Sequence, residues 1–235
     1  MLERAREAGI QRILVPGWDL VSSEAALQLA GRHPDLVQAA VGIHPHDAAV
    51  MDEAGWARLE ALAAEPATRA IGEIGLDHHR NLSPPDVQRA ALDRQLELAA
   101  RLGLPVLVHD REAHAEVEGA LLAWDGRTGA AARGVLHAFS GDAAMATRLA
   151  AAGFLISFAL PVAFRSSAGP REAAGLLETG RFVVETDAPY LGPDRERRNE
   201  PTTALRVAAE LARLRGTTPD QLIGPIREAY EALIG

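Results

Sequence analysis

Short apolar runs alternate with longer amphipathic stretches along the whole chain. The runs are typical of buried strands, and the stretches, in which apolar residues recur every three or four positions, are typical of helices. Strands that alternate with helices pack as a parallel sheet covered by helices. Seven strands are expected, at Arg12–Val15, Val37–Val41, Thr68–Ile71, Leu104–Val108, Gly134–Leu136, Phe154–Phe158 and Phe182–Val184.

Turn and cap residues mark where several helices begin and end. The first helix is expected to stop at Gly9 and the second to start at Ser22. Ser83 is expected to cap the helix that follows the third strand, because proline and then an acid follow it at the positions that favour a helix start. The tail from Pro201 is expected to form two helices separated near Gly216.

The regular length of these units favours a closed barrel over an open sheet. The predicted fold class is therefore α/β, a (β/α)8 TIM barrel that lacks its first β-strand, since an eighth strand would have to precede Met1. No linker-like stretch interrupts the alternation, so residues 1–235 are expected to form a single domain.

Composition narrows the chemistry that the chain can use. Cysteine is absent, so any metal must be held by His, Asp or Glu. All 24 basic residues are arginine, which excludes a lysine nucleophile and a carbamylated-lysine bridge between metals. The formal net charge of −8 argues against a protein that coats nucleic acid, although a local arginine patch could still hold phosphates.

The chain shows no signal for export or for membrane insertion. No apolar run is long enough to span a bilayer, and the charged start at Met1–Glu7 lacks the apolar core of a signal peptide. A cytoplasmic location without a membrane partner is expected, and the oligomeric state is left open.

Ligand-type side chains follow four of the predicted strands: Glu73, His109, His137 and Asp187. The carboxyl ends of barrel strands open onto one face, so these residues are expected to converge there, with His44 beside them. Two imidazoles and two carboxylates suit zinc, manganese or a related divalent ion. For Glu73 taken alone, an ion pair with a nearby arginine such as Arg80 is the competing interpretation.

These positions lie in six motifs that occur in order along nearly the whole chain. They are Gly42-Ile43-His44-Pro45-His46, Gly72-Glu73-Ile74-Gly75-Leu76-Asp77, His109-Asp110-Arg111, Leu136-His137-Ala138-Phe139-Ser140-Gly141, Glu185-Thr186-Asp187-Ala188-Pro189-Tyr190 and Arg198-Asn199-Glu200-Pro201. The set resembles the TatD-like metal-dependent hydrolases of the amidohydrolase superfamily. The resemblance implies a barrel of the metallo-dependent hydrolase type, with one or two divalent metal ions (Zn, Mg or Mn) and DNA or nucleotide-chain ends as substrate.

The resemblance also assigns roles to individual residues. Glu73 is expected to bridge the metals, and His109 and His137 to bind one of them. Asp187 is expected to bind metal and to orient or deprotonate the attacking water, which makes Asp187 and Glu73 the catalytic pair. The residues expected to bind substrate are His44, Arg111 and Arg198, with Arg195 and Arg197 completing a basic cluster on the same loop.

One departure from the family pattern affects the metal count. The first strand of the family usually carries an Asp-x-His-x-His motif that supplies two imidazoles to the other metal, and this sequence has no such motif. Three explanations stay open: a start codon placed too late, a shortened chain, or a member that works with one firmly held metal.

The leading functional prediction is a deoxyribonuclease, exonuclease-like, that cleaves phosphodiester bonds with a metal-activated water. A hydrolase of another ester or amide, such as an aminoacyl ester on RNA, is the second hypothesis. A non-catalytic binding protein is the third, because the metal-ligand strand is absent. His78, His79 and His114 lie on connecting segments without a matched partner and are expected at the surface. Trp18, Trp56 and Trp124 are assigned to packing in preference to base stacking.

Overall fold

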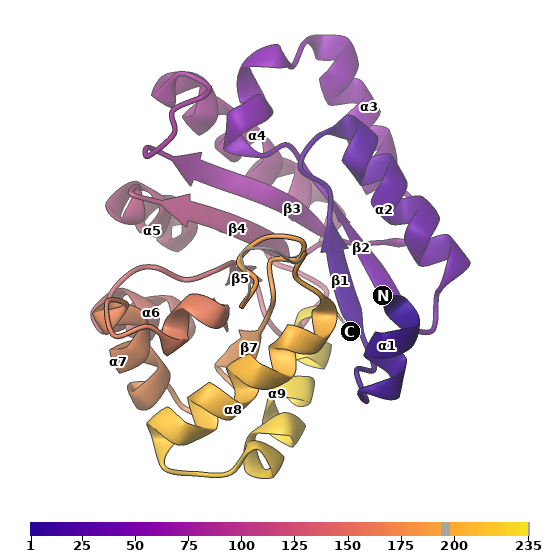
Figure 1. Cartoon of the computed structure of the whole chain (residues 1–235). Coiled ribbons are helices and arrows are strands. Elements are labelled where there is room, and N and C mark those ends of the chain that lie inside the picture. Colours follow the sequence, from indigo (N-terminus) through magenta and orange to yellow (C-terminus); the bar gives the residue numbers. More distant parts are fainter. Residues whose placement is uncertain (194–197, 235) are drawn as a thin grey trace. The chain divides into compact units, whose positions relative to one another are not determined.

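The computed structural model describes residues 1–193 and 198–234 (Figure 1). Within this part of the chain, seven strands follow one another in sequence order, each hydrogen-bonded to the next. Chain contacts group these residues into two compact units, one made of residues 12–135 with residue 234 and the other of residues 1–11 with 136–233.

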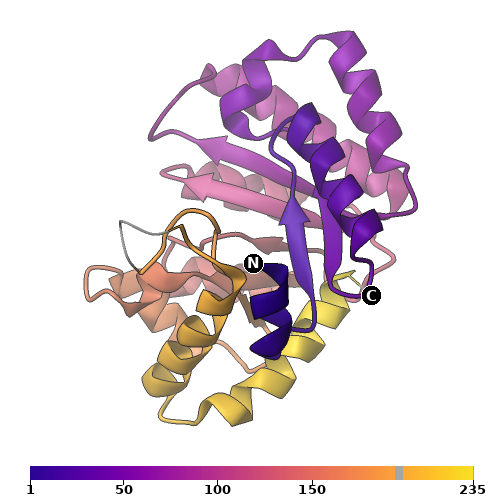
Figure 2. The same cartoon turned by 45° about the vertical axis from the view of Figure 1, so that its right-hand side comes forward.

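The unit of residues 12–135 contains four strands that pair in parallel. They are β1 (Ile13–Pro16), β2 (Val37–Val41), β3 (Thr68–Asp77) and β4 (Val106–Arg111). The connections are α2 (Leu20–Arg32), the 3-10 helix η1 (Pro45–Val50), α3 (Glu53–Ala63), α4 (Pro85–Leu102) and α5 (His114–Ala123). Helices α2, α3 and α4 lie along the outer face of the strands (Figure 2).

The other unit contains β6 (Phe154–Phe158) and β7 (Phe182–Val184), which also pair in parallel. Its helices are α1 (Leu2–Glu7), α6 (Ala143–Ala151), η2 (Leu160–Ala163), α7 (Ala168–Leu176), η3 (Pro201–Thr203), α8 (Ala204–Arg215) and α9 (Pro219–Ile234). The strand β5 (Gly134–Leu136) is shared between the two units. None of the described helices is long and apolar enough to cross a bilayer.

Seven parallel strands alternating with helices confirm the predicted α/β fold class. The bounds of β5, β6 and β7 agree with the apolar runs from which they were predicted. The two tail helices also meet at Gly216, which adopts the left-handed conformation that ends α8. Within the described residues β1 ends the strand order, and the single domain over residues 1–235 stays a prediction.

The prediction that the third strand ends before Glu73 is wrong. Strand β3 continues to Asp77, because Ile74 and Leu76 are fully buried and the strand goes on pairing with β4 there. Glu73 therefore lies inside β3, where the pairing with β4 shifts register between Ile71 and Ile74. In the same way, β4 includes His109 and runs on through Arg111.

Two predicted helix starts are also wrong. The cap of α2 is Asp19, whose side chain accepts from the Ser22 N–H at 2.7 Å, so Ser22 lies in the first turn instead of starting the helix. Ser83 does not cap α4. Its buried hydroxyl donates to the carbonyl of His46 at 2.9 Å and accepts from the N–H of Ala49 at 3.0 Å, so it holds η1 in place.

Candidate metal centre

Three ligand-type side chains meet inside the unit of residues 12–135. Glu73 Oε1 lies 3.0 Å from His109 Nδ1 and 3.6 Å from His44 Nε2. The donor atoms of the three residues all lie within 4.8 Å of one another. Because donors about 2.1 Å from a tetrahedral ion are themselves about 3.4 Å apart, these separations suit a single divalent ion.

The protonation state of His44 also suits metal binding. Burial lowers the pKa of His44 to about 3, against the opposing effect of the Glu73 carboxylate. The imidazole is therefore neutral near pH 7, and the neutral form is the one that binds metal. The three residues together fit a divalent cation by distance and by charge.

A buried carboxylate orients two of the histidines. Asp77 Oδ2 lies 2.7 Å from His46 Nε2 and 3.4 Å from His109 Nε2, while His109 turns its Nδ1 toward Glu73. Burial acts to raise the pKa of Asp77, but the backbone N–H of Arg80 and the side chain of His46 outweigh it and hold that pKa at about 2. Such carboxylate–histidine contacts fix the ring of a metal ligand.

Two buried glutamines on α4 hold the backbone around this cluster, and the sequence analysis missed both. Gln95 accepts from the Ile43 N–H at 2.7 Å and donates to the Ile43 carbonyl at 3.0 Å, directly before His44. Gln88 accepts from the Asp77 N–H at 2.8 Å. The signal was available, because both residues occupy the apolar face of α4 two turns apart, where a buried polar side chain needs a partner.

Replacing Gln95 by leucine is expected to weaken both the fold and the metal site. The change leaves the N–H and the carbonyl of Ile43 without their buried partner, at about 1–3 kcal/mol for each group. Unfolding in urea, read by circular dichroism, measures the loss. Gln28→Leu is the matched control, because Gln28 is exposed on α2 and its replacement is expected to leave the midpoint nearly unchanged. Equal midpoints for the two variants would contradict the role of Gln95.

The buried His44 predicts a pH dependence of stability. Its folded pKa of about 3 lies below the ordinary value of 6.5, so the unfolded chain binds the extra proton as the pH falls between those values. Stability of the metal-free protein is therefore expected to fall by up to about 1.4 kcal/mol per pH unit from pH 6.5 toward pH 4. In denaturant titrations, His44→Gln is expected to remove the contribution of one proton from the slope of unfolding free energy against pH. An unchanged slope would contradict the low pKa of His44.

A second cluster lies in the unit of residues 1–11 and 136–233. His137 Nδ1 lies 2.9 Å from Glu185 Oε1, and His137 Nε2 lies 3.6 Å from Asp187 Oδ1. Glu185 is held in turn by the hydroxyl of the buried Ser157, which donates to Oε2 at 2.5 Å. Glu185 thus orients the His137 ring and leaves Nε2 to face Asp187, the arrangement typical of a histidine that binds metal.

Asn199 shapes the loop that carries Asp187. This buried amide donates to the carbonyl of Thr186 at 2.6 Å and to that of Tyr190 at 2.7 Å, while the Tyr190 N–H donates to the carbonyl of Asp187 at 2.7 Å. The next residue, Glu200, forms an ion pair with Arg4 of α1 at 2.6 Å. The Arg-Asn-Glu-Pro motif therefore has a structural role beside any contact with substrate.

The structure brings the predicted ligands together in two groups. Glu73 and His109 meet with His44, and His137 meets with Asp187. The convergence of all four predicted ligands stays a prediction. The competing ion pair between Glu73 and Arg80 is wrong, since in the described residues Arg80 meets Asp77 through its backbone N–H and no ion pair joins it to Glu73.

Two of the arginines predicted to bind substrate are exposed side chains. Arg111 is exposed at the end of β4, where its register partner is Asp77 on β3. Arg198 is exposed next to the buried Asn199. Arg195 and Arg197 lie outside the described residues.

Two smaller predictions concern the outlying histidines and the tryptophans. Of the histidines expected at the surface, His79 is exposed and its Nδ1 lies 2.7 Å from Glu112, while His114 is half-buried and its Nδ1 lies 2.8 Å from Asp110. The assignment of all tryptophans to packing holds for Trp56, which is 8% exposed, but not for Trp18, which is 51% exposed.

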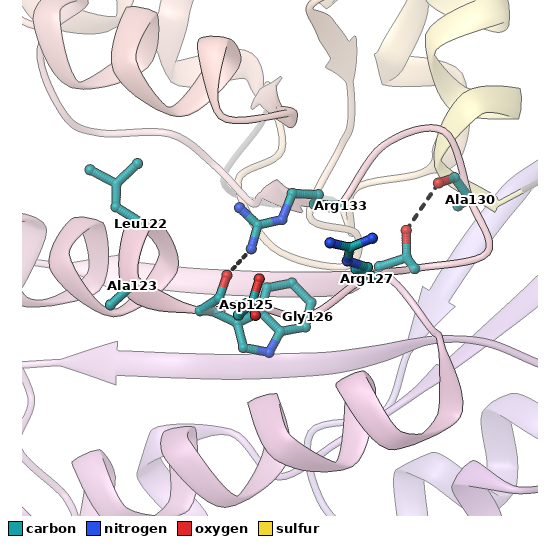
Figure 3. A pocket seen from close by; sticks show the side chains of 9 residues that line it. Leu122, Ala123, Asp125, Gly126, Arg127, Ala130 and Arg133 are labelled. Atoms are coloured by element: carbon teal, nitrogen blue, oxygen red, sulfur yellow. Dashed lines mark hydrogen bonds between the residues drawn. The ribbon is translucent and has the colours of Figure 1, made fainter.

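A cavity of about 690 Å³ lies in the unit of residues 12–135 (Figure 3). It is formed by residues 122–133, the end of α5 and the loop that leads into β5, and Arg133 donates there to the carbonyl of Trp124. None of the predicted site residues lines it. The candidate sites are therefore the two histidine–carboxylate clusters, each within its own unit.

Comparison with known proteins identifies the family. Residues 1–235 match the family described as TatD related DNase. The chain is 38% identical over 229 residues to the "3'-5' ssDNA/RNA exonuclease TatD" of Erwinia tasmaniensis, an alignment that covers 94% of this chain and 87% of that protein. It is 34% identical over 224 residues to the "Uncharacterized metal-dependent hydrolase YabD" of Bacillus subtilis, covering 94% and 86%.

A solved structure agrees with this result. The TatD homologue YJJV of Escherichia coli superposes with a TM-score of 0.91 at 30% identity, over 99% of this chain and 90% of that one. A family match over the whole chain, relatives above 30% identity and a shared fold lead to the same conclusion. The chain belongs to the TatD-related DNase family.

Proposed function

We propose that this protein is a metal-dependent exonuclease that removes nucleotides from the 3' end of single-stranded DNA or RNA. The observation that carries the proposal is the group of the buried His44 and the half-buried Glu73 and His109, whose donor atoms are spaced for one divalent ion. The proposal is supported by relatives named as 3'-5' exonucleases that align over most of their length.

The metal would be held by Glu73 and His109, with His44 as a third ligand in addition to the substrate contact first assigned to it. His137 and Asp187 are the other proposed ligands. A divalent ion at such a site acidifies a water molecule and offsets the negative charge of the phosphate. Zinc and manganese suit the mixture of imidazole and carboxylate donors, and magnesium is the alternative when carboxylates dominate.

Carboxylates of the chain would accept the proton and hold the histidine ligands in position. Asp187 is proposed to take the proton from the attacking water, because its carboxylate is part-exposed and lies beside the His137 ring. Asp77 and Glu185 keep the rings of His109 and His137 in the orientation that presents one nitrogen each.

Arginines would hold the phosphates of the substrate. Arg111 and Arg198 are both exposed, and a guanidinium binds phosphate oxygens through two parallel hydrogen bonds. Because the net charge of −8 repels nucleic acid at long range, only about two or three phosphate contacts are expected, which gives a shallow salt dependence with a slope near −2 in log affinity against log salt.

The test measures nucleotide release from a 3'-labelled single strand with added magnesium, manganese or zinc. Asp187→Asn is expected to lower the rate at least about a hundredfold, since general-base groups contribute about 10²–10⁴-fold. Asp220→Asn, an exposed position on α9 of the same unit, is the matched control and should keep full activity. An aminoacyl-ester substrate runs in parallel. If the Asp187→Asn variant releases nucleotides as fast as the wild type, the mechanism is refuted. If the wild type hydrolyses only the aminoacyl ester, the protein is an ester hydrolase and not an exonuclease.

A further inference from the structure

Trp18 differs from the other tryptophans of the chain. The ring of Trp56 is buried under Arg94, whose guanidinium carbon lies 4.8 Å from the ring centroid, and Trp124 donates its indole N–H to the carbonyl of Leu96 at 2.9 Å. Trp18 is 51% exposed. A large aromatic side chain therefore offers an open surface directly after β1.

The backbone of Gly17 and Trp18 is hydrogen-bonded to two of the candidate metal ligands. The carbonyl of Trp18 accepts from the N–H of His44 at 2.8 Å, and the carbonyl of the preceding Gly17 accepts from the N–H of Glu73 at 2.7 Å. Neighbouring strands lie about 4.8 Å apart, so Trp18 is one strand spacing from His44. The backbone of Trp18 therefore lies beside the candidate metal ligand His44.

The anchor of this tryptophan is rigid. The N–H of Trp18 donates to the hydroxyl of Ser22 at 2.8 Å, and Ser22 belongs to the capping box of α2. Gly17 is closely packed as well, since a Cβ on it would lie 2.2 Å from the hydroxyl oxygen of Ser23. A ring on a fixed backbone loses little conformational freedom when it binds a flat ligand.

From this geometry we infer that the indole of Trp18 is a stacking platform for a nucleobase of the single-stranded substrate, close to the end that is cleaved. The inference rests on the proposed exonuclease function and adds a subsite for the base to the contacts for phosphate. Every base has a π-face, so stacking provides affinity without sequence preference. It also provides affinity without positive charge, which suits a chain of net charge −8. Bases inside a duplex are already stacked, so the platform favours single strands and frayed ends.

The experiment compares KM and kcat for wild type, Trp18→Ala and Trp18→Phe on oligonucleotides that carry one abasic residue at successive positions from the 3' end. On the intact strand, Trp18→Ala is expected to raise KM roughly 10- to 100-fold, the factor that stacking of one base is worth. The phenylalanine variant should recover part of this loss. Val21→Ala, which removes another exposed apolar side chain nearby in sequence, is the control and should leave KM unchanged.

The abasic series identifies the contact. At one position, removal of the base should raise the KM of the wild type by the same factor as Trp18→Ala raises it on the intact strand. Removal of that base should not raise the KM of the Trp18→Ala variant any further. The salt slope of binding should be the same in wild type and Trp18→Ala, because stacking neutralises no phosphate. The stacking proposal would be refuted if Trp18→Ala left KM unchanged, or if the effects of the variant and of the abasic residue on KM were additive at every position. Neither result would contradict the exonuclease function. Failure of the wild type to release nucleotides from any strand would overturn both.

Discussion

Replacing Glu73 by glutamine is expected to abolish hydrolysis and to strip the protein of its metal. Glu73 Oε1 is the atom that faces both His109 and His44, so the change removes the negative charge shared by the whole group. Loss of a residue that only orients a ligand already costs about 10–100-fold in metal affinity or activity, and loss of a ligand should exceed that. Elemental analysis of the purified variant and its rate of nucleotide release are the two measurements.

The matched control for this change is Glu97→Gln. Glu97 is exposed on α4 in the same unit, so its replacement should keep both the metal and the rate. His109→Ala is expected to lose metal as Glu73→Gln does. If Glu73→Gln and His109→Ala both kept their full metal content, the proposed metal centre would be refuted, whatever their activity.

Replacing Gly75 by alanine is expected to cost the fold about 2–6 kcal/mol, the sum of backbone strain and steric overlap. Gly75 has a φ of +142°, which side-chain-bearing residues rarely adopt, and an added Cβ would lie 1.9 Å from the carbonyl oxygen of His109. Since β3 and β4 pair at this point, the overlap would also displace His109 from Glu73. The midpoint of urea unfolding and the metal content of the folded variant measure the two effects.

Gly119→Ala tests whether the effect is specific to the position. Gly119 lies in α5, and nothing approaches within 4 Å of an added Cβ there, so alanine should stabilise the protein by about 0.5–1 kcal/mol. If Gly75→Ala and Gly119→Ala were equally stable, β3 and β4 would be able to move apart at Gly75 at no cost in the free energy of unfolding.

The alternation of apolar runs and amphipathic stretches determined the fold class. Strands such as Phe154–Phe158 and Gly134–Leu136 were located by their length and by the turn residues around them, because a buried strand needs an uninterrupted apolar run. The ligand-type residues could also be found, since each stands at or near the end of such a run. The motifs around them led to the correct family.

Tertiary contacts decided what the local sequence left ambiguous. The two glycines beside Glu73 suggested a strand end, yet β3 continues because the burial of Ile74 and Leu76 outweighs the weak strand preference of glycine. Ser83 has the sequence signature of a helix cap, but its hydroxyl is used by the backbone of η1, which comes from far away in sequence. A local sequence preference is overridden wherever burial or a hydrogen bond to a distant residue contributes more free energy.

The partners within the site were likewise a tertiary result. The sequence by itself determined which residues could bind metal and that the chain has no cysteine or lysine to offer. Only the folded chain decided that His44 joins Glu73 and His109, and that Asp77 and Glu185 orient histidines. It also decided that Trp18 stays exposed next to His44. The reason is physical: residue type sets the chemistry of a side chain, whereas its pKa, its partners and its exposure come from neighbours that the chain brings together only by folding.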